Sequence, residues 1–165
     1  MKRVVSNTGP VLHLQESQCL SLLEQAGEIY IPEAVDMEMR QLDLNWYDHK
    51  PDWLVVQVVS EPYSTQAIRW EQAGLLHRGE VEAVALAQEL NADWFLTDDS
   101  AARVFATALG LEVHGTLGVI LWAAAVGHLS YDEAKSALNR LVQSSLWMSL
   151  RILAEAHAAL NQLFS

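Results

Sequence analysis

Short apolar runs alternate with stretches of helical periodicity along most of the chain. The runs are rich in β-branched and aromatic residues, which favours strands. The predicted strands are Arg3–Ser6, Ile29–Ile31, Trp53–Val59, Trp94–Leu96 and Leu111–Val113. Because strands separated by helices are joined by right-handed crossovers, the pattern predicts an α/β fold of three layers, a mainly parallel central sheet flanked by helices.

Helix signals fill the segments between these strands. Apolar residues from Val11 to Leu23 predict either one interrupted helix or two short ones, and Pro32 is placed to open another. The polar and aromatic stretch 43–52 is predicted to be a loop. The further predicted helices run from Ser64 or Thr65 to about Gly74, from Gly79 or Glu80 to Asn91, over 101–109, 115–126 and 131–142, and over much of 145–163.

No linker, repeat or low-complexity segment divides the chain, so we expect a single domain over 1–165 with a helical extension from about residue 130. The longest apolar run, Leu117–Val126, falls well short of the roughly 20 residues that a membrane helix needs and predicts a buried core helix. The single cysteine, Cys19, cannot form an internal disulfide, and no long apolar leader precedes the first strand. Both features favour the cytoplasm.

The chain is acidic, with 21 Asp and Glu against 10 Lys and Arg and a net charge of −11. Phosphate binding draws its affinity from Lys, Arg and released counterions, so this balance argues against tight, nonspecific nucleic-acid binding. It is compatible with a basic protein partner. Acids gathered around a metal ion would also be partly neutralised by it.

Two acidic clusters stand where a strand or loop ends and a helix begins. Glu80 follows Gly79 at a predicted helix start, and Asp98 and Asp99 follow the strand that ends at Leu96. A third such position, Asn7, is not acidic. Side chains at strand ends and in first helical turns point into the crevice where open α/β sheets bind ligands, and carboxylates that converge there need a cation between them.

Each of these residues also has a simpler explanation. Asn7 is a good helix N-cap, Asp98 and Asp99 are placed to cap the next helix, and Glu80 complements a helix dipole. Capping alone does not require the three positions to meet, whereas a metal site does. Glu38, on the helix after Pro32, is equally well explained as a solvated carboxylate.

The remaining polar and aromatic residues suggest less. The six histidines show no paired metal-ligand spacing, so no zinc site is predicted. Trp46 and Trp53 could stack on RNA bases, although burial or a partner interface is the simpler role. Arg78 and Arg103 flank the acidic positions and are candidate phosphate contacts, with solvated helix ends as the alternative.

Several segments, in this order and spacing, together resemble one family. The segments are Val4–Pro10, Ile31–Val35 with Glu38, Gly79–Ala87, Leu96–Asp99 with Arg103, Gly115–Val119, Leu138–Leu141 and Leu146–Ser149. They resemble the PIN-domain family, and within it the branch related to VapC toxins. The likeness covers almost the whole chain, and no single motif would carry it.

The resemblance implies a metal-dependent endoribonuclease that uses Mg²⁺ or Mn²⁺ to activate water against phosphate. The family's four acids fall on Asn7, Glu38, Glu80 and Asp99, with Asp98 as the neighbouring candidate for the fourth, and its small hydroxyl falls on Thr8. Glu80 or Asp99 would orient the attacking water. The VapC-related branch further implies a toxin, a cognate antitoxin as partner, RNA as substrate and a homodimer.

Asn7 is the departure from the family pattern. Its amide oxygen can ligate a hard cation but brings no negative charge and cannot act as a general base. Two interpretations therefore stay open, an active ribonuclease with weakened metal binding and a catalytically impaired binding or regulatory module. A phosphoacceptor domain, suggested by fold analogy alone, is a third, but the acids and lysines are not arranged for it.

Overall fold

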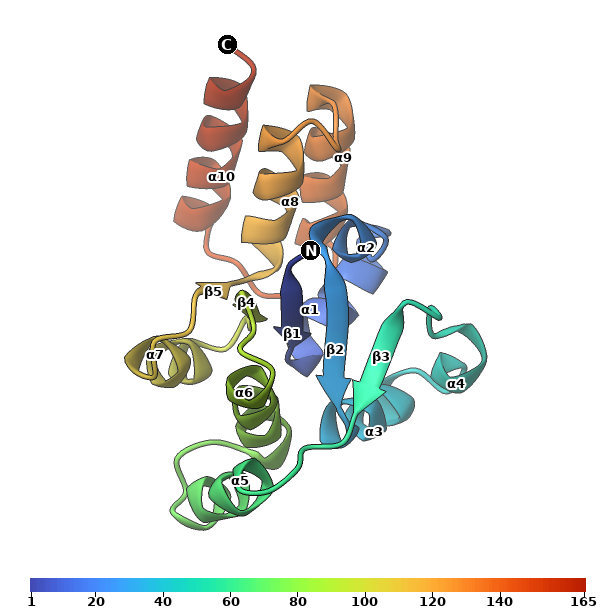
Figure 1. Cartoon of the computed structure of the whole chain (residues 1–165). Coiled ribbons are helices and arrows are strands. Elements are labelled where there is room, and N and C mark those ends of the chain that lie inside the picture. The colour runs from blue at the N-terminus through green and yellow to red at the C-terminus, as the bar shows by residue number, and fades with distance from the viewer.

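The computed structural model describes residues 1–165 and is built on one five-stranded, all-parallel sheet (Figure 1). The strands are β1 (Arg3–Ser6), β2 (Glu28–Pro32), β3 (Leu54–Gln57), β4 (Trp94–Leu96) and β5 (Val113–His114). Their order across the sheet is β3-β2-β1-β4-β5, and Val4 of β1 lies opposite Ile29 of β2 and Trp94 of β4. The predicted α/β fold with a parallel central sheet is confirmed.

The strand order reverses at β1. The chain runs from β1 outward to β2 and β3, then crosses back to place β4 and β5 on the other side of β1. Right-handed crossovers therefore put the helices that connect β1, β2 and β3 on one face of the sheet. They put the helices that lead to β4 and β5 on the other face. The reversal falls between β1 and β4, and ligands of open α/β sheets bind outside the carboxyl ends of the strands at such a point.

Ten helices cover the sheet. They are α1 (Thr8–Glu16), α2 (Leu22–Ala26), α3 (Glu33–Leu42), α4 (Trp46–His49), α5 (Tyr63–Gln72), α6 (Arg78–Glu89), α7 (Ser100–Ala108), α8 (Thr116–Ala125), α9 (Tyr131–Val142) and α10 (Leu150–Leu163). α6 packs on β1, β2 and β4 and carries α5 on its outer side. α8 packs on α1 and α2, and α9 and α10 pack on α8 (Figure 1).

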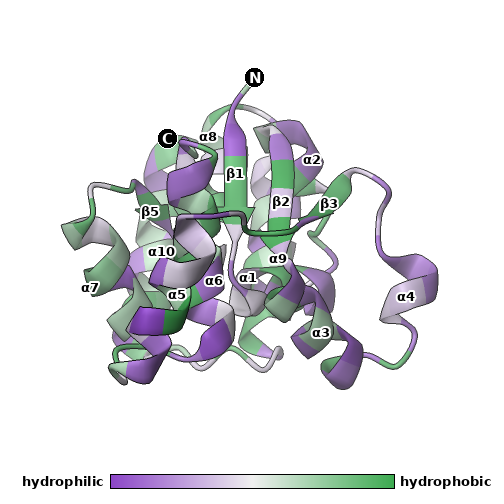
Figure 2. Cartoon of the chain, turned by 60° about the horizontal axis from the view of Figure 1, so that its bottom comes forward, coloured by the Kyte–Doolittle hydropathy of each residue, from purple (hydrophilic) through white to green (hydrophobic).

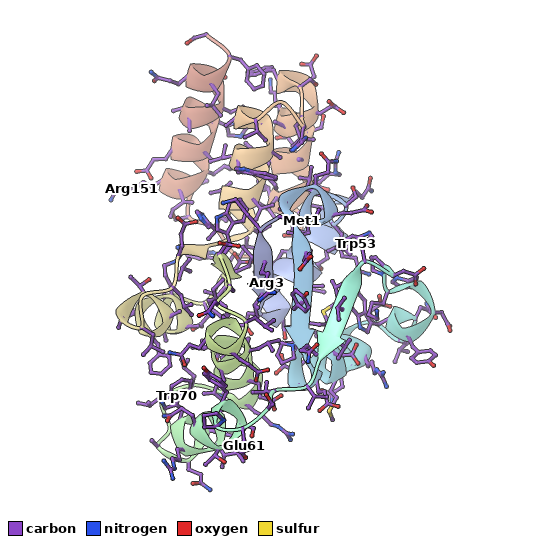
Figure 3. All side chains as sticks on the ribbon, viewed as in Figure 1. Met1, Arg3, Trp53, Glu61, Trp70 and Arg151 are labelled. Carbon is purple, nitrogen blue, oxygen red and sulfur yellow. The ribbon has the colours of Figure 1, made fainter.

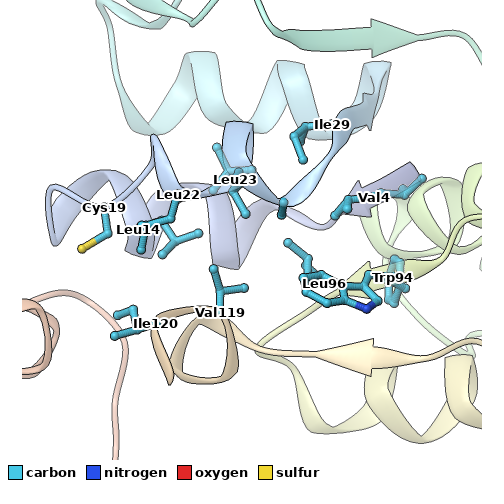
Figure 4. Close-up of a cluster of buried hydrophobic side chains, with 14 of the residues drawn as sticks. Val4, Leu14, Cys19, Leu22, Leu23, Ile29, Trp94, Leu96, Val119 and Ile120 are labelled. Carbon is cyan, nitrogen blue, oxygen red and sulfur yellow. The ribbon is translucent and has the colours of Figure 1, made fainter. Parts of the chain in front are cut away.

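The core lies where these layers meet. Val4 and Leu96 from the strands, Leu14 and Leu23 from α1 and α2, and Ile120 from α8 are fully buried in one cluster (Figure 4). Figure 2 shows hydrophobic residues along the central strands and mainly hydrophilic ones on α4 at the periphery. The apolar run from Leu117 forms α8 and packs in this core as predicted, and no helix has the length and apolarity needed to cross a membrane.

The structure corrects the prediction at four places. The stretch 43–52, predicted to be a loop, contains the short helix α4, because Trp46 is fully buried and its indole N–H donates to Asp36 Oδ1 over 2.9 Å. α5 begins at Tyr63 after Pro62, so neither Ser64 nor Thr65 is its N-cap. β3 and β5 are edge strands, each paired with a single neighbouring strand. Only the residues that form this pairing are in the strand, so both are shorter than predicted.

Candidate active site

Asn7 comes directly after β1, beside the point where the strand order reverses. Its backbone N–H donates to the carbonyl of Leu96 at the end of β4 over 2.9 Å, and its Nδ2 donates to Thr97 Oγ1 over 3.2 Å. Its Oδ1 accepts from the N–H of Thr8, which makes Asn7 the N-cap of α1. The side chain is only 6% exposed. Asn7 is thus both a helix cap and part of the crevice.

Glu38 reaches the same crevice from α3. Its Oε2 accepts a hydrogen bond of 2.5 Å from Thr8 Oγ1. The carboxylate also lies so close to α6 that a Cβ on Gly79 would collide with Glu38 Oε1. Only glycine leaves room for this approach. Thr8 therefore contacts an acid, and Glu38 is not a solvated surface residue.

Glu80 lies in the first turn of α6, where its Oε1 accepts from the backbone N–H of His77 over 3.0 Å. Burial raises the pKa of Glu80 above its usual range, although the His77 N–H opposes the rise. The negative charge of Asp99 raises the pKa of Glu80 further, so the two carboxylates are close neighbours. They come from two elements that are separate in sequence and meet only in the fold.

Asp99 is the N-cap of α7. Its Oδ2 accepts from the N–H of Ala102 over 2.8 Å, and its own N–H donates to Thr97 Oγ1 over 3.2 Å. The buried Thr97 hydroxyl therefore contacts both Asn7 and Asp99 and fixes their spacing. The predicted cap and the predicted site residue are one and the same, because one oxygen of a carboxylate is enough for the cap.

The side chain of Asp98 instead forms hydrogen bonds to residues of other helices. Its side chain accepts from Thr116 N over 2.8 Å and from Thr116 Oγ1 over 2.6 Å, and it lies 2.6 Å from His13 Nδ1. Burial works against its ionisation, but the hydrogen bonds from His13 and Thr116 outweigh burial and hold the pKa of Asp98 below its usual range. Asp98 thus joins the β4–α7 turn to α1 and α8, while Asp99 is the acid beside Glu80.

The two arginines differ in where they point. Arg78 Nε donates to Glu82 Oε2 over 3.0 Å, and Glu71 of α5 and Glu33 of α3 are its next acidic neighbours, so acids other than Glu80 and Asp99 offset its charge. Arg103 stands one turn after Asp99 on α7, and its N–H donates to the Asp99 carbonyl over 3.0 Å. Its guanidinium lies near Gly115 and forms no ion pair.

The donor set of the crevice suits a divalent cation that keeps several of its waters. Glu80 and Asp99 are two like charges close together, which the raised pKa of Glu80 reflects and which a cation would relieve. Nowhere do three His, Cys, Asp or Glu side chains converge closely enough to hold a metal by themselves. Asn7 brings no charge, and Thr8 engages the Glu38 carboxylate. The residues fit a hydrated Mg²⁺-like ion, which often keeps several waters and takes one or two carboxylates.

The sequence did not point to three residues that shape the crevice. Thr97 spaces Asn7 and Asp99, and His13 and Thr116 hold Asp98. A single hydroxyl after a strand or a lone histidine in a helix carries no spacing signal, so only the fold reveals their role.

Comparison with known families agrees with this geometry. A family model described as a PIN domain matches residues 3–162. No curated protein matches the chain. PIN domains are generally nucleases that act on RNA or DNA with divalent metal ions.

Proposed function

Because this chain belongs to the PIN-domain family, we propose that it is a divalent-metal-dependent endoribonuclease whose principal acids are Glu80 and Asp99. One observation carries the proposal. Asp99 and Asn7 are bound to the same Thr97 hydroxyl where the strand order reverses, and the charge of Asp99 adds to the burial that raises the pKa of Glu80. Two helix caps would not need this proximity, whereas a cation site does.

The proposed ligand set for Mg²⁺ or Mn²⁺ is Glu80 and Asp99, with Asn7 and Glu38 at its edge. When bound, such an ion lowers the pKa of a coordinated water and offsets negative charge on phosphate. Glu80 and Asp99 orient that water, and the carboxylate of one of them is the acceptor for its proton. Asn7 contributes an uncharged oxygen, so metal binding is expected to be weak.

The surrounding residues have supporting roles in this proposal. Thr8 fixes the Glu38 carboxylate, and Arg103 is the cation placed to meet a phosphate near Asp99. Arg78 is less suited to a phosphate contact because Glu82 already neutralises it. Asp98, which the sequence left as an alternative to Asp99, acts as a positioning residue because its oxygens are bonded to Thr116 and His13.

We propose further that the chain is the toxin of a toxin–antitoxin pair and forms a homodimer. The resemblance to the VapC-related branch supports this role, and the net charge of −11 suits a basic antitoxin. Expression of the protein alone should arrest growth, and the Asp99→Asn variant should not. Co-expression of a small basic protein encoded beside it should restore growth. Light scattering during gel filtration measures the oligomeric state.

The alternative is a PIN-like binding or regulatory module that has lost catalysis. Asn7 favours it, since its amide is already engaged by Thr8 and Thr97 and supplies no charge to the ion. Growth arrest by the Asp99→Asn variant as well as by wild type would support this alternative.

The direct test is cleavage of structured RNA by the purified protein with Mn²⁺ or Mg²⁺. Wild type should cleave with metal and not with EDTA. Asp99→Asn should lose roughly 100-fold or more of the rate while keeping its fold, because asparagine is also a good N-cap. Asp52→Asn, an exposed acid outside the crevice, is the matched control. No cleavage with any divalent metal would reject the nuclease proposal.

A further inference from the structure

A cavity of about 620 Å³ lies between α8 and α10, two helices that pack on each other side by side (Figure 1). Trp94 of β4 and His114 of β5 complete its lining. The space stays open because both helices line it with small residues, among them Gly118, Ala125, Ala158 and Ala159. Its volume falls within the range of about 300–1,000 Å³ that is typical of small-molecule sites. The cavity therefore has room for a small organic molecule.

No Asp, Glu, Lys or Arg lines this cavity. Eight of its eleven lining residues are hydrophobic, and the other three are Gly118, His114 and Gln162. The whole chain, in contrast, carries 21 acidic and 10 basic residues. A phosphate, carboxylate or ammonium group would lose its hydration in the cavity without gaining an ion-pair partner. The lining therefore suits an uncharged molecule and disfavours a nucleotide.

Three aromatic rings form one wall of the cavity. The indoles of Trp94 and Trp122 meet edge to face, with centroids 5.3 Å apart and planes at 89°, and the His114 ring centroid lies 4.7 Å from that of Trp94. Trp53 and Trp70 lie in other parts of the molecule, near β3 and on α5 (Figure 3). Because the rings of the wall already hold one another in place, a ligand need not order them, which lowers the cost of binding.

His114 adds a hydrogen-bond acceptor to this aromatic wall. Its Nε2 lies 3.0 Å from Glu112 Oε2, and because an ionised carboxylate only accepts, Nε2 carries the hydrogen. Nδ1 of the neutral ring is then the acceptor. Nδ1 lies beside Gly118, where an added Cβ would stand 3.9 Å from it. Glycine at this position of α8 therefore leaves Nδ1 uncovered on the side of the cavity.

We propose that this cavity binds a small, flat, uncharged aromatic molecule with one N–H or O–H donor. The ring of the ligand packs against the apolar lining, and its donor meets His114 Nδ1. Indole has this combination of properties, and 1-methylindole has the same ring system without the donor. Neither Glu80 nor Asp99 lines the cavity, so the proposal is independent of the nuclease function.

Calorimetric titration of the full chain with indole and with 1-methylindole tests the ligand class. Indole should bind with a Kd on the order of 0.1–1 mM, as befits a molecule of its size. 1-Methylindole should bind about tenfold more weakly, because it leaves the acceptor without a partner. His114→Phe should abolish this difference, since phenylalanine keeps a ring beside Trp94 but has no acceptor.

Two further variants alter the cavity without disturbing the fold. Gly118→Ala adds a methyl group at an ordinary contact distance from Nδ1 and favours the helix, so it should lower the affinity for indole to that for 1-methylindole while the protein stays folded. Ala159→Phe adds a ring from an exposed position of α10 and should prevent the binding of both ligands. Trp70→Phe, outside the cavity in a second aromatic pair, is the control and should change neither affinity.

Nuclear magnetic resonance gives the location of the ligand. Indole should shift the side-chain N–H resonances of Trp94 and Trp122 and leave that of Trp70 in place. Equal affinity of wild type for the two ligands, or binding of indole to Ala159→Phe as tight as to wild type, would overturn the proposal. So would a dimer that Ala159→Phe converts to a monomer in a protein that binds no indole, because the cavity would then be a contact between copies.

Discussion

Asn7 both caps a helix and contacts Thr97 in the crevice. Its Oδ1 is used by the N–H of Thr8, and its Nδ2 is used by Thr97. An aspartate at this position would keep the capping oxygen. The Thr97 hydroxyl could then reverse and donate to it, because a hydroxyl is both donor and acceptor.

Asn7→Asp should therefore bind Mg²⁺ or Mn²⁺ roughly tenfold or more tightly than wild type, since affinity grows with the charge of the ligand set. Its RNA cleavage rate should rise as well. Without metal, the variant should unfold at a lower temperature, because it adds a third charge to Glu80 and Asp99. Isothermal titration calorimetry measures the affinity, and equal magnesium titrations for both proteins would show that Asn7 is not a ligand position.

Asp98 determines how the stability of the protein is expected to depend on pH. Because the pKa of Asp98 is lower in the folded protein than in the unfolded chain, its stabilising effect is fully present above its ordinary pKa and is lost as the pH falls through the folded value. Asp98→Asn should cost about 3 kcal/mol in the free energy of unfolding at about pH 7, since it leaves buried partners unmatched. The cost should shrink as the pH falls below about 4, the ordinary pKa of an aspartate, and on through the lower folded value.

Urea unfolding of wild type and Asp98→Asn across this pH range measures the difference. Asp93→Asn, which removes an acid that the backbone N–H of Arg3 contacts at the surface, is the comparison variant. A cost for Asp98→Asn that stays constant with pH would mean that Asp98 is not ionised in the fold.

At the scale of elements, the crevice is assembled by the close approach of α1, α3 and α6. α3 packs on both α1 and α6, and the Glu38 carboxylate fills the contact between Thr8 and Gly79. α6 can come this near because Gly79, in its first turn, has no Cβ. The position of Glu38 thus depends on an absent side chain on another helix.

Gly79→Ala should displace the Glu38 carboxylate and break its bond to Thr8, while the fold survives because the displaced atoms end a flexible side chain. Alanine also favours the helix over glycine by up to about 1 kcal/mol, so the melting temperature should stay the same or rise slightly. RNA cleavage should fall to the level of Glu38→Gln. Unchanged cleavage in both variants would show that Glu38 has no part in the reaction.

At the scale of the whole molecule, the negative charge limits how RNA can bind. A protein of net charge −11 with Arg103, one turn after Asp99, as its candidate phosphate contact has few such contacts to offer. Its RNA affinity should depend on shape, base stacking and metal more than on counterion release.

The dependence of RNA affinity on salt should therefore be shallow. A plot of log affinity against log salt should have a slope between about −0.7 and −1.4, which corresponds to one or two phosphate contacts on single-stranded RNA. Arg103→Gln should reduce its magnitude by about 0.7, and Arg69→Gln, an exposed arginine on α5, should leave it unchanged. A slope of several units would contradict Arg103 as the main phosphate contact.

Much of the fold was predictable because the signals are local. Apolar runs placed all five strands, Gly110 ended α7 with a φ of 85°, and Ser130 began α9 as an N-cap. The short helix α4 was missed because its cause is distant: Trp46 is buried against Asp36 of α3. The lengths of the edge strands β3 and β5 were overestimated because apolar residues continue along the sequence beyond the last residue that pairs with a neighbouring strand.

The order of the residues was enough to predict the parallel α/β architecture, the family and the acids at the ends of strands and the starts of helices. These follow from periodicity, caps and motif order, which are properties of neighbouring residues. The tertiary structure alone decided that Asp99 and not Asp98 lies beside Glu80, that Gly79 makes room for Glu38, and that His114 and Gly118 line one cavity with Trp94 and Trp122. Each of these depends on distances between segments far apart along the chain, and only the packing of the helices on the sheet sets those distances.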